Sequence, residues 1–310
     1  MLQSAAIVCT KDRPEALSRT VSSIHRHGQE ALRLLVVVDA SDPQTVDQNK
    51  VRLSQVSDPR TVHISYSGLP SSARQRNLGI DRLPSDVDLV FFLDDDVTVQ
   101  PEYFDSIIDL FRQNPDVQGI GGFDVTHDSL PPYSIRRLLR YLFLLDHPRP
   151  GRILPSGNAS PPQRTTSEHP VAVDWLPGFS MTLRRDVLET ERFSPALDRY
   201  SYCEDCDLTV RVRKHGPLLS HPNARLAHRR SPKSRHDARD LQHSLLAHLY
   251  WFMEKNVEHP LKKPAFWWST LGRLLAVLFS TKSQKWKALS GLLKGIRTIW
   301  TRSHPLLESS

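Results

Sequence analysis

The sequence of 310 residues is poor in the features that mark exported, disulfide-stapled or membrane-spanning proteins. It contains 3 cysteines, too few for a disulfide framework, and its N-terminus lacks the basic and long apolar segments of a secretory signal. The most apolar stretch, residues 265–280, contains Arg273 and falls short of the roughly 20 residues that a spanning helix needs. These absences favour a cytoplasmic protein.

Basic residues outnumber acidic ones by 41 to 34, which gives a formal net charge of +7. Such a charge attracts anionic partners, which include nucleic acid, a lipid headgroup surface and a charged substrate, and it does not choose among them. The length suits one large domain or two modest ones, with room for a sizeable core.

The first 125 residues alternate short β-rich runs with helical patterns, which is typical of βαβ units. Strands are expected at residues 5–9, 34–38, 62–66, 89–93 and 119–125. Leu17, Val21 and Ile24 mark one face of an intervening helix, and residues 73–83 indicate another. The pattern predicts an α/β fold with a doubly wound sheet, and the polar, proline-rich residues 147–170 predict a long surface loop.

Three adjacent carboxylates, Asp94, Asp95 and Asp96, end an apolar run that reads as a buried strand. Ligands of open parallel sheets bind outside the carboxyl ends of the strands, which is where this acidic triplet is expected. Carboxylates so close together repel one another unless a cation such as Mg²⁺ or Mn²⁺ offsets their charge. The alternative is an aspartate-rich turn that caps a helix starting at Pro101.

Cys203 and Cys206 have the spacing of half a zinc site, and His221 and His228 follow them. The two histidines lie further apart than the gap of about three to five residues usual in zinc sites, and no second cysteine pair exists. A basic nucleic-acid-binding protein with a Cys/His zinc module is therefore one alternative, although such a binder does not call for a buried acidic triplet.

The region beyond residue 240 changes to helical patterns rich in aromatic and basic residues. As a helix, residues 285–300 have an apolar face and a basic face. The apolar face is formed by Trp286, Leu289, Leu293, Ile296 and Trp300, and the basic face by Lys287, Lys294 and Arg297. This separation is typical of a helix that lies in the surface of an anionic membrane. The alternative is that residues 265–300 pack on the protein itself.

Taken in order, six short motifs resemble the family 2 glycosyltransferases, nucleotide-sugar enzymes with the GT-A fold. The motifs are TKDRP at 10–14, VDASD at 38–42, ARQRNLGI at 73–80, the acidic triplet at 94–96, WLPGFS at 175–180 and EDCDL at 204–208. The resemblance implies a Rossmann-like, doubly wound mixed sheet with a C-terminal helical extension. It divides the chain into a catalytic domain at 1–235, with a nucleotide-binding half (1–125) and an acceptor-binding half (126–235), and an extension at 236–310.

The same resemblance implies a metal-dependent, inverting transfer of a sugar from a UDP- or dTDP-sugar to a hydroxyl of a glycan or lipid-linked acceptor. Mn²⁺ or Mg²⁺ would act as a Lewis acid on the leaving diphosphate. Asp96 is the expected direct metal ligand, with Asp94 and His228 beside it. The expected nucleotide-sugar cradle consists of Thr10, Arg13, Asp39, Arg76, Asp94 and Asp95, with Asp39 accepting from the base ring.

Inversion also needs a base that takes the proton of the acceptor hydroxyl. Asp205 is the expected base, held ionised by the N-terminus of a helix, and Glu204 is the second candidate. Trp175 and Gly178 are the expected acceptor-binding residues. The glutamine-x-x-arginine-tryptophan motif of processive synthases is absent, which favours addition of single sugars.

A second enzyme class, the nucleotidyltransferases, also combines an α/β sheet with a metal-bound aspartate pair. It calls for a glycine-rich phosphate loop after the first strand, which TKDRP is not. As partners we expect a donor sugar nucleotide, an acceptor and no nucleic acid. The location expected is cytoplasmic, either soluble or peripheral on the inner face of the membrane.

Overall fold

A mixed β-sheet forms the centre of the computed structural model, which describes residues 2–56, 58–126, 134–164, 167–197, 202–229, 237–281 and 283–308. In this part of the chain the sheet has nine strands. They are β1 (Ser4–Thr10), β2 (Leu34–Asp39), β3 (Thr61–Ser65), β4 (Leu89–Asp94), β5 (Val97–Val99), β6 (Gly119–Asp124), β7 (Val171–Val173), β8 (Ser180–Arg184) and β9 (Leu218–His228). Their order is β3-β2-β1-β4-β8-β6-β9-β5, with β7 beside β9.

Strands β3, β2, β1 and β4 run parallel, and β8 is antiparallel to both of its neighbours, β4 and β6. The register places Thr10 beside Asp39 and Cys9 beside Asp94, so three strands end at one edge of the sheet. The five predicted strands are confirmed as β1, β2, β3, β4 and β6. Strands β1, β2 and β4 are apolar without alternation because helices cover both faces of the sheet.

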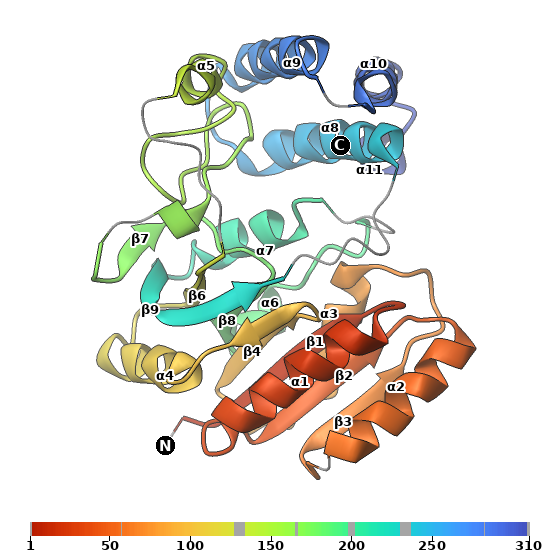
Figure 1. The fold of residues 1–310 in the computed structure, drawn as a ribbon. Coiled ribbons are helices and arrows are strands. Elements are labelled where there is room, and N and C mark those ends of the chain that lie inside the picture. The colour runs from red at the N-terminus through yellow and green to blue at the C-terminus, as the bar shows by residue number, and fades with distance from the viewer. Residues whose placement is uncertain are drawn as a thin grey trace.

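Helices cover both faces, as a doubly wound sheet requires (Figure 1). One face carries α1 (Pro14–Gly28), α2 (Pro43–Val56) and α4 (Tyr103–Gln113). The other carries α3 (Ser72–Asp81), α6 (Val187–Thr190) and α7 (Glu204–Val212). The remaining helices are α5 (Ile135–Leu142), η1 (Pro162–Arg164), α8 (Ala238–Asn256), α9 (Lys262–Leu278), α10 (Lys285–Thr301) and α11 (Pro305–Glu308).

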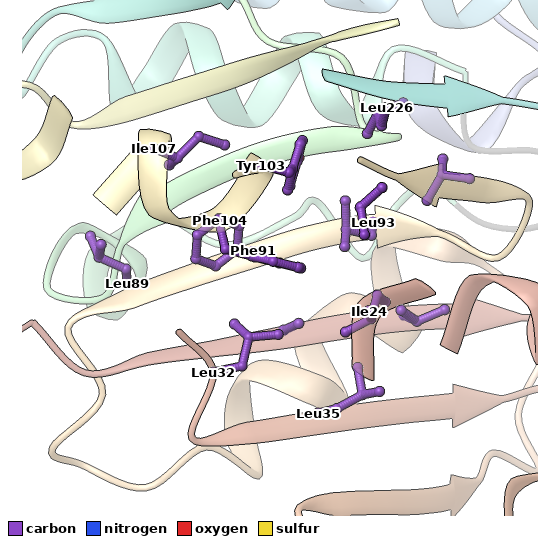
Figure 2. Close-up of a cluster of buried hydrophobic side chains, with 14 of the residues drawn as sticks. Ile24, Leu32, Leu35, Leu89, Phe91, Leu93, Tyr103, Phe104, Ile107 and Leu226 are labelled. Carbon is purple, nitrogen blue, oxygen red and sulfur yellow. The ribbon is translucent and has the colours of Figure 1, made fainter. Parts of the chain in front are cut away.

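The core beside β4 is built on aromatic side chains. Phe91 meets Phe104 edge to face at 5.1 Å between ring centroids, and Tyr103 meets Phe104 in the same way and at the same distance (Figure 2). The Tyr103 hydroxyl forms a hydrogen bond of 2.6 Å with Ser180 of β8. Edge-to-face pairs add about 0.5–1.5 kcal/mol each to the burial of the rings. This packing fixes β4, whose last residue is Asp94.

The C-terminal helices form a second layer beyond the carboxyl edge of the sheet (Figure 1). Helix α10 docks on α8 through Gly291 and Gly295, and a Cβ on Gly291 would lie 2.2 Å from the carbonyl oxygen of Arg239. The predicted apolar face of this helix points elsewhere, because Trp286 and Trp300 are 67% and 77% exposed. In the described residues no helix combines the length and hydropathy needed to cross a membrane.

The expectation of a surface loop at residues 147–170 is wrong for its middle part. Ser156, Asn158 and Ser160 are buried because the chain folds back on itself and satisfies their polar groups locally. Ser156 Oγ and Asn158 Nδ2 donate to the carbonyl oxygen of Leu144, and Ser160 Oγ donates to that of Arg149. The segment thereby forms a wall between the sheet and the C-terminal layer.

Candidate functional site

A cavity of about 1090 Å³ opens at the carboxyl edge of the sheet, between the sheet and the C-terminal helices. Its wall includes residues from the end of β1, the start of α3, the end of β4 and the start of α7. Helices α8 and α9 contribute Leu249 and Arg273. The proposed helical extension therefore lines the same space as the strand ends. The predicted site residues on the wall are Thr10, Arg13, Arg76, Asp94, Asp95, Trp175, Gly178, Glu204 and Asp205.

Asp94, Asp96 and His228 form a cluster in which one potential ligand atom of each lies within 4.8 Å of the others. His228 is the last residue of β9 and pairs in register with Val97, which places it directly beside the acidic triplet. Its Nε2 lies 3.1 Å from Asp96 Oδ1, and its ring lies 4.6 Å from that of Phe179. Among the described residues this is the group with the spacing of a metal site.

The donor atoms of this cluster suit a divalent cation. Two carboxylates and an imidazole are ligands that Mn²⁺ accepts readily, and Mg²⁺ is satisfied by the carboxylates with added water and phosphate oxygens. Burial by itself lowers the pKa of His228, but the hydrogen bond to Asp96 and the charges of Asp94 and Asp96 outweigh it and raise the pKa. The local field therefore favours positive charge at this position.

Asp95 points away from this cluster and holds two other predicted residues. Its carboxylate accepts from Thr10 Oγ1 at 2.7 Å and from Arg13 Nη1 at 3.0 Å. Burial raises the pKa of Asp95 to about 6, although the charge of Arg13 opposes the shift. Asp95 thus positions Thr10 and Arg13 at the cavity wall.

Arg76 joins the two acidic motifs. It is 3% exposed and contacts Asp94 Oδ1 at 3.0 Å, Glu204 Oε1 at 3.1 Å and the carbonyl oxygen of Gly178 at 3.0 Å. A Cβ on residue 178 would lie 2.9 Å from Arg76 Nη2, so any larger residue there would displace the guanidinium. The predicted nucleotide-cradle residue is therefore also the link that sets Asp94 and Glu204 relative to each other.

The predicted base lies at the start of α7. Asp205 Oδ2 accepts from the backbone N–H of Gly178 at 2.9 Å, and Glu204 also accepts from Ser72 Oγ at 3.0 Å. Burial raises the pKa of both carboxyls, that of Glu204 to about 7 with a further contribution from the charge of Asp205. Desolvation therefore dominates over the helix N-terminus that was expected to hold Asp205 ionised.

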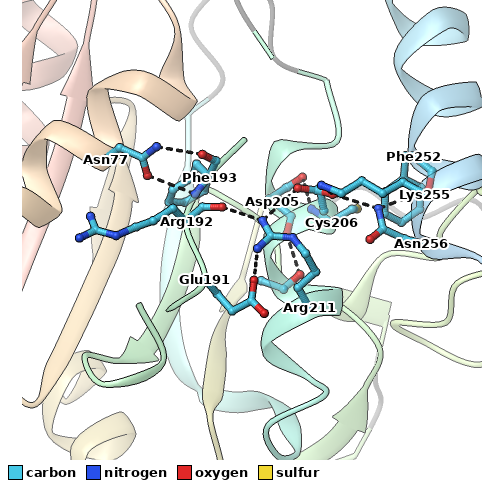
Figure 3. Close-up of polar contacts among 12 residues, drawn as sticks. Asn77, Glu191, Arg192, Phe193, Asp205, Cys206, Arg211, Phe252, Lys255 and Asn256 are labelled. Atoms are coloured by element: carbon cyan, nitrogen blue, oxygen red, sulfur yellow. Dashed lines mark hydrogen bonds and ion pairs between the residues drawn. The ribbon is translucent and has the colours of Figure 1, made fainter. Parts of the chain in front are cut away.

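Helix α7 is anchored by the third carboxylate of its first turn. Asp207 is fully buried and meets Lys255 Nζ at 2.7 Å and Asn256 Nδ2 at 3.0 Å, both from α8. It also pairs with Arg211 at 3.0 Å, and Arg211 in turn reaches Glu191 (Figure 3). With its oxygens thus engaged, Asp207 acts as an anchor that leaves Glu204 and Asp205 at the cavity.

The structure does not bring Asp39 to the cavity. Its carboxylate is 0% exposed and accepts from Asn49 Nδ2 at 2.8 Å, from Ser41 N–H at 2.9 Å and from His63 Nε2 at 3.0 Å. These hydrogen bonds outweigh burial and lower the pKa of Asp39. In this arrangement Asp39 ties β2 to α2 and β3, and its contact with a base ring stays a prediction.

Trp175 lies on the wall, where its Nε1 donates to the carbonyl oxygen of Ser160 at 3.0 Å. The wall also contains residues that the sequence did not single out as a site, among them Ser72, Arg140 and Tyr202. Arg273 also lies on the wall, and the sequence marks it as unusual because this charged residue interrupts the apolar stretch at 265–280.

The cysteines do not assemble the zinc module considered above. Cys203 and Cys206 are free, buried and packed among apolar side chains of the C-terminal helices. His228 lies with the aspartates, and His221 is buried elsewhere on β9. In the described ranges the four Cys and His residues do not form a group with metal-site spacing.

The glucosyl-dolichyl phosphate glucuronosyltransferase of Haloferax volcanii is 29% identical over 130 residues, which cover 39% of this chain and 38% of the relative. The matched part thus spans well under two thirds of that protein.

Solved structures are similar over nearly the whole chain. GalNAc-T7 with UDP, GalNAc and Mn²⁺ superposes with a TM-score of 0.64 at 14% identity, covering 99% of this chain and 58% of that one. The Pyrobaculum calidifontis mannosyltransferase PcManGT with GDP-Man and Mn²⁺ gives 0.56 at 14% identity, covering 99% and 85%. S. aureus TarS gives 0.54 at 11% identity, covering 95% and 81%.

At these identities the structures establish the fold, and the predicted GT-A architecture is confirmed. The model of the family described as "Glycosyl transferase family 2" matches residues 5–166. Because that match covers more than half of the sequence, the chain belongs to glycosyl transferase family 2.

Proposed function

We propose that this protein is a metal-dependent, inverting and non-processive glycosyltransferase. It would take a sugar from a UDP- or dTDP-sugar and add it to a hydroxyl of a glycan or lipid-linked acceptor. The observation that carries the proposal is the meeting of two acidic motifs at one cavity. Asp94 and Asp96 offer carboxylates beside His228. Of these three, Asp94 lines the cavity, as do Glu204 and Asp205, and Arg76 pairs with both Asp94 and Glu204.

Asp94, Asp96 and His228 would hold Mn²⁺ or Mg²⁺, which as a Lewis acid offsets negative charge on the diphosphate of the donor. The other positive charges near the diphosphate would come from arginine side chains. Arg13 adds a guanidinium beside the triplet, and Arg76 keeps Asp94 in place.

Asp205 would take the proton of the attacking hydroxyl at Oδ1 or Oδ2. Its raised pKa brings the basicity of this carboxylate closer to neutral pH, which suits general-base catalysis. Gly178 N–H holds one of its oxygens in a fixed direction. Glu204 is the second candidate for the base. Arg76 and Ser72 engage its Oε1, while Asp205 accepts from the N–H of Gly178 at Oδ2 and from that of Cys206 at Oδ1.

The relatives support the donor and acceptor classes. The two solved structures with ligands contain UDP or GDP-Man, each together with Mn²⁺. The relative from H. volcanii is named for a substrate carried on dolichyl phosphate, which is a lipid-linked acceptor. A nucleotidyltransferase is less well supported, because the loop after β1 lacks the glycines of a phosphate-binding loop.

A panel of nucleotide sugars tests this proposal. Thermal unfolding and donor hydrolysis are measured for UDP-, dTDP- and GDP-sugars, each with Mn²⁺, with Mg²⁺ and with a chelator. A bound donor raises the apparent stability by mass action, and we expect the increase only with a metal present. Stabilisation by nucleoside triphosphates and not by sugar nucleotides, with release of pyrophosphate once a sugar phosphate is added, would instead favour the nucleotidyltransferase.

We further propose that the protein lies peripherally on the cytoplasmic membrane face. Trp286, Leu293 and Trp300 of α10 are exposed although their helix is docked, and Lys294 and Arg297 are exposed on the same helix. Co-sedimentation with anionic but not neutral vesicles, weakened by salt, is the expected result. Trp300→Ser should weaken it without disturbing the packing of α10 on α8. A protein that stays in the supernatant with anionic vesicles at low salt contradicts this location.

A further inference from the structure

The cavity has a second charged region, away from the acidic motifs. Arg140 of α5 and Arg273 of α9 both line it, and they lie close enough for the charge of Arg140 to lower the pKa of Arg273. The wall near them includes Leu145 and Asn158, which Arg140 and Arg273 contact, and Tyr202 and Cys203 beside Arg273. One space thus runs from carboxylates at the sheet edge to two guanidinium groups beneath the C-terminal layer.

Arg273 has no carboxylate partner among the described residues. Its Nη2 donates to Asn158 Oδ1, and its buried Nε has no hydrogen-bond partner in the described chain. Desolvation lowers its pKa, yet a guanidinium keeps its charge in a protein. The other arginines on the wall differ, because each pairs with an aspartate, Arg13 and Arg76 at 3.0 Å and Arg140 at 3.4 Å.

Arg273 is half-buried, and an unpaired charge that is partly removed from water is costly unless a ligand offsets it. A guanidinium presents several N–H donors in a planar fork, which matches the oxygens of a phosphate group. Arg140 is only partly engaged, by Asp146 at 3.4 Å and the carbonyl oxygen of Leu145 at 3.2 Å. The chemistry of this end of the cavity therefore fits a phosphate.

The elements that carry the two arginines also carry an exposed apolar surface. Ile135 and Leu138 of α5 are 78% and 67% exposed, and Phe279 at the end of α9 is 84% exposed. The two helices lie side by side in the outer layer, held by the Trp268 Nε1 hydrogen bond to the carbonyl oxygen of Leu142 (Figure 1). Exposed apolar side chains thus lie on the same two helical segments as the two arginines.

We propose that Arg273 and Arg140 bind the phosphate of a lipid-anchored acceptor, whose hydrocarbon chain leaves over the apolar surface of α5 and α9. This inference rests on the proposed glycosyl transfer and narrows its acceptor to a sugar carried on a lipid phosphate or lipid diphosphate, with a hydroxyl of that sugar as the attacking group. The acceptor hydroxyl then points along the cavity toward Asp205. A glycan without phosphate has no use for the two guanidinium groups.

Calorimetric titration of the full chain tests the proposal with three probes: farnesyl phosphate, farnesol and inorganic phosphate. Farnesyl phosphate should bind at least about 10-fold more tightly than either of the others, because only it fills the cationic end and the apolar surface together. Arg273→Gln should weaken its binding by about 10- to 100-fold, the range for losing a charged hydrogen bond. Arg140→Gln should weaken it to a smaller extent.

Arg136→Gln is the matched control, since Arg136 lies on α5 and is exposed to solvent. It should leave farnesyl phosphate binding within about twofold of wild type. Equal binding of farnesol and farnesyl phosphate, or equal binding by wild type and Arg273→Gln, overturns the proposal. Preference for inorganic phosphate over farnesyl phosphate would also overturn it, because the site would then serve a soluble anion.

UDP binding with Mn²⁺ is measured on the same samples. Retained UDP binding in Arg273→Gln shows that the variant is folded and that the lost site is separate. If wild type fails to bind UDP with Mn²⁺, the proposed glycosyl transfer is contradicted. The farnesyl phosphate titration then still shows whether Arg273 and Arg140 bind a lipid phosphate. Should Arg273→Gln not fold, the three-probe comparison on wild type and Arg140→Gln decides.

Discussion

Replacing Arg76 by methionine should both destabilise the protein and disable the site. The substitution removes a buried cation and leaves Asp94 and Glu204 facing each other without a counter-charge. Breaking one side of a buried ion pair costs about 3–5 kcal/mol. The Asp94 side chain is 38% exposed and partly screened by water, whereas that of Glu204 is 14% exposed. We therefore expect the free energy of unfolding to fall by about 3 kcal/mol, the lower end of that range.

Urea unfolding at pH 8, where most of the Glu204 carboxyl is ionised, measures this loss. Arg74→Met is the matched control, because Arg74 lies two residues away on the same helix and is exposed. Arginine and methionine have similar helix propensities, so the control should change stability by less than about 0.5 kcal/mol. The reasoning is refuted if Arg76→Met is as stable as Arg74→Met.

Three further predictions concern the base and a buried histidine. Asp205→Asn should reduce turnover by at least ~10²-fold with donor binding intact, whereas near wild-type transfer would move the role to Glu204. Because the pKa of Glu204 is raised to about 7 and that of Asp205 is raised as well, kcat/KM should fall as pH drops below about 7, and a flat profile down to pH 5 contradicts a base in this pair. Burial, aided by the charge of His304, lowers the pKa of His248 to about 4. Because the unfolded chain then binds the proton at higher pH than the folded one, stability is lost as pH falls from about 6.5 toward 4. Between pH 7.5 and 4.5, urea unfolding of wild type should lose roughly 2 kcal/mol more than that of His248→Gln, and equal losses would exclude the effect.

The parallel half of the sheet was predictable because its strands are uninterrupted apolar runs. Strands β5 and β7 were not, since each has 3 residues and pairs with a distant part of the chain. Helix α2 also escaped prediction, because only Val46, Asn49 and Leu53 of its residues are buried and its apolar periodicity is weak. Short or weakly amphipathic elements take their structure from neighbours that the sequence does not identify.

The site was predictable where the resemblance supplied a role for a residue, and unpredictable where the role depends on contacts between separate elements. The acidic triplet and His228 come together as the resemblance implied. The role of Arg76 as a link between Asp94 and Glu204 depends on three separate elements, and the burial of Asp39 depends on contacts with α2 and β3. Neither follows from spacing along the sequence.

Calorimetric titration of UDP into wild type and Asp96→Asn, with and without Mn²⁺, tests the central claim most directly. Asp96 is 7% exposed and holds His228, so asparagine keeps the shape while removing the charge that would bind the cation. We predict UDP binding to wild type only with Mn²⁺, and no such binding to Asp96→Asn at an unchanged melting temperature. Equal UDP binding by the two proteins, or binding by wild type that ignores Mn²⁺, would contradict the account.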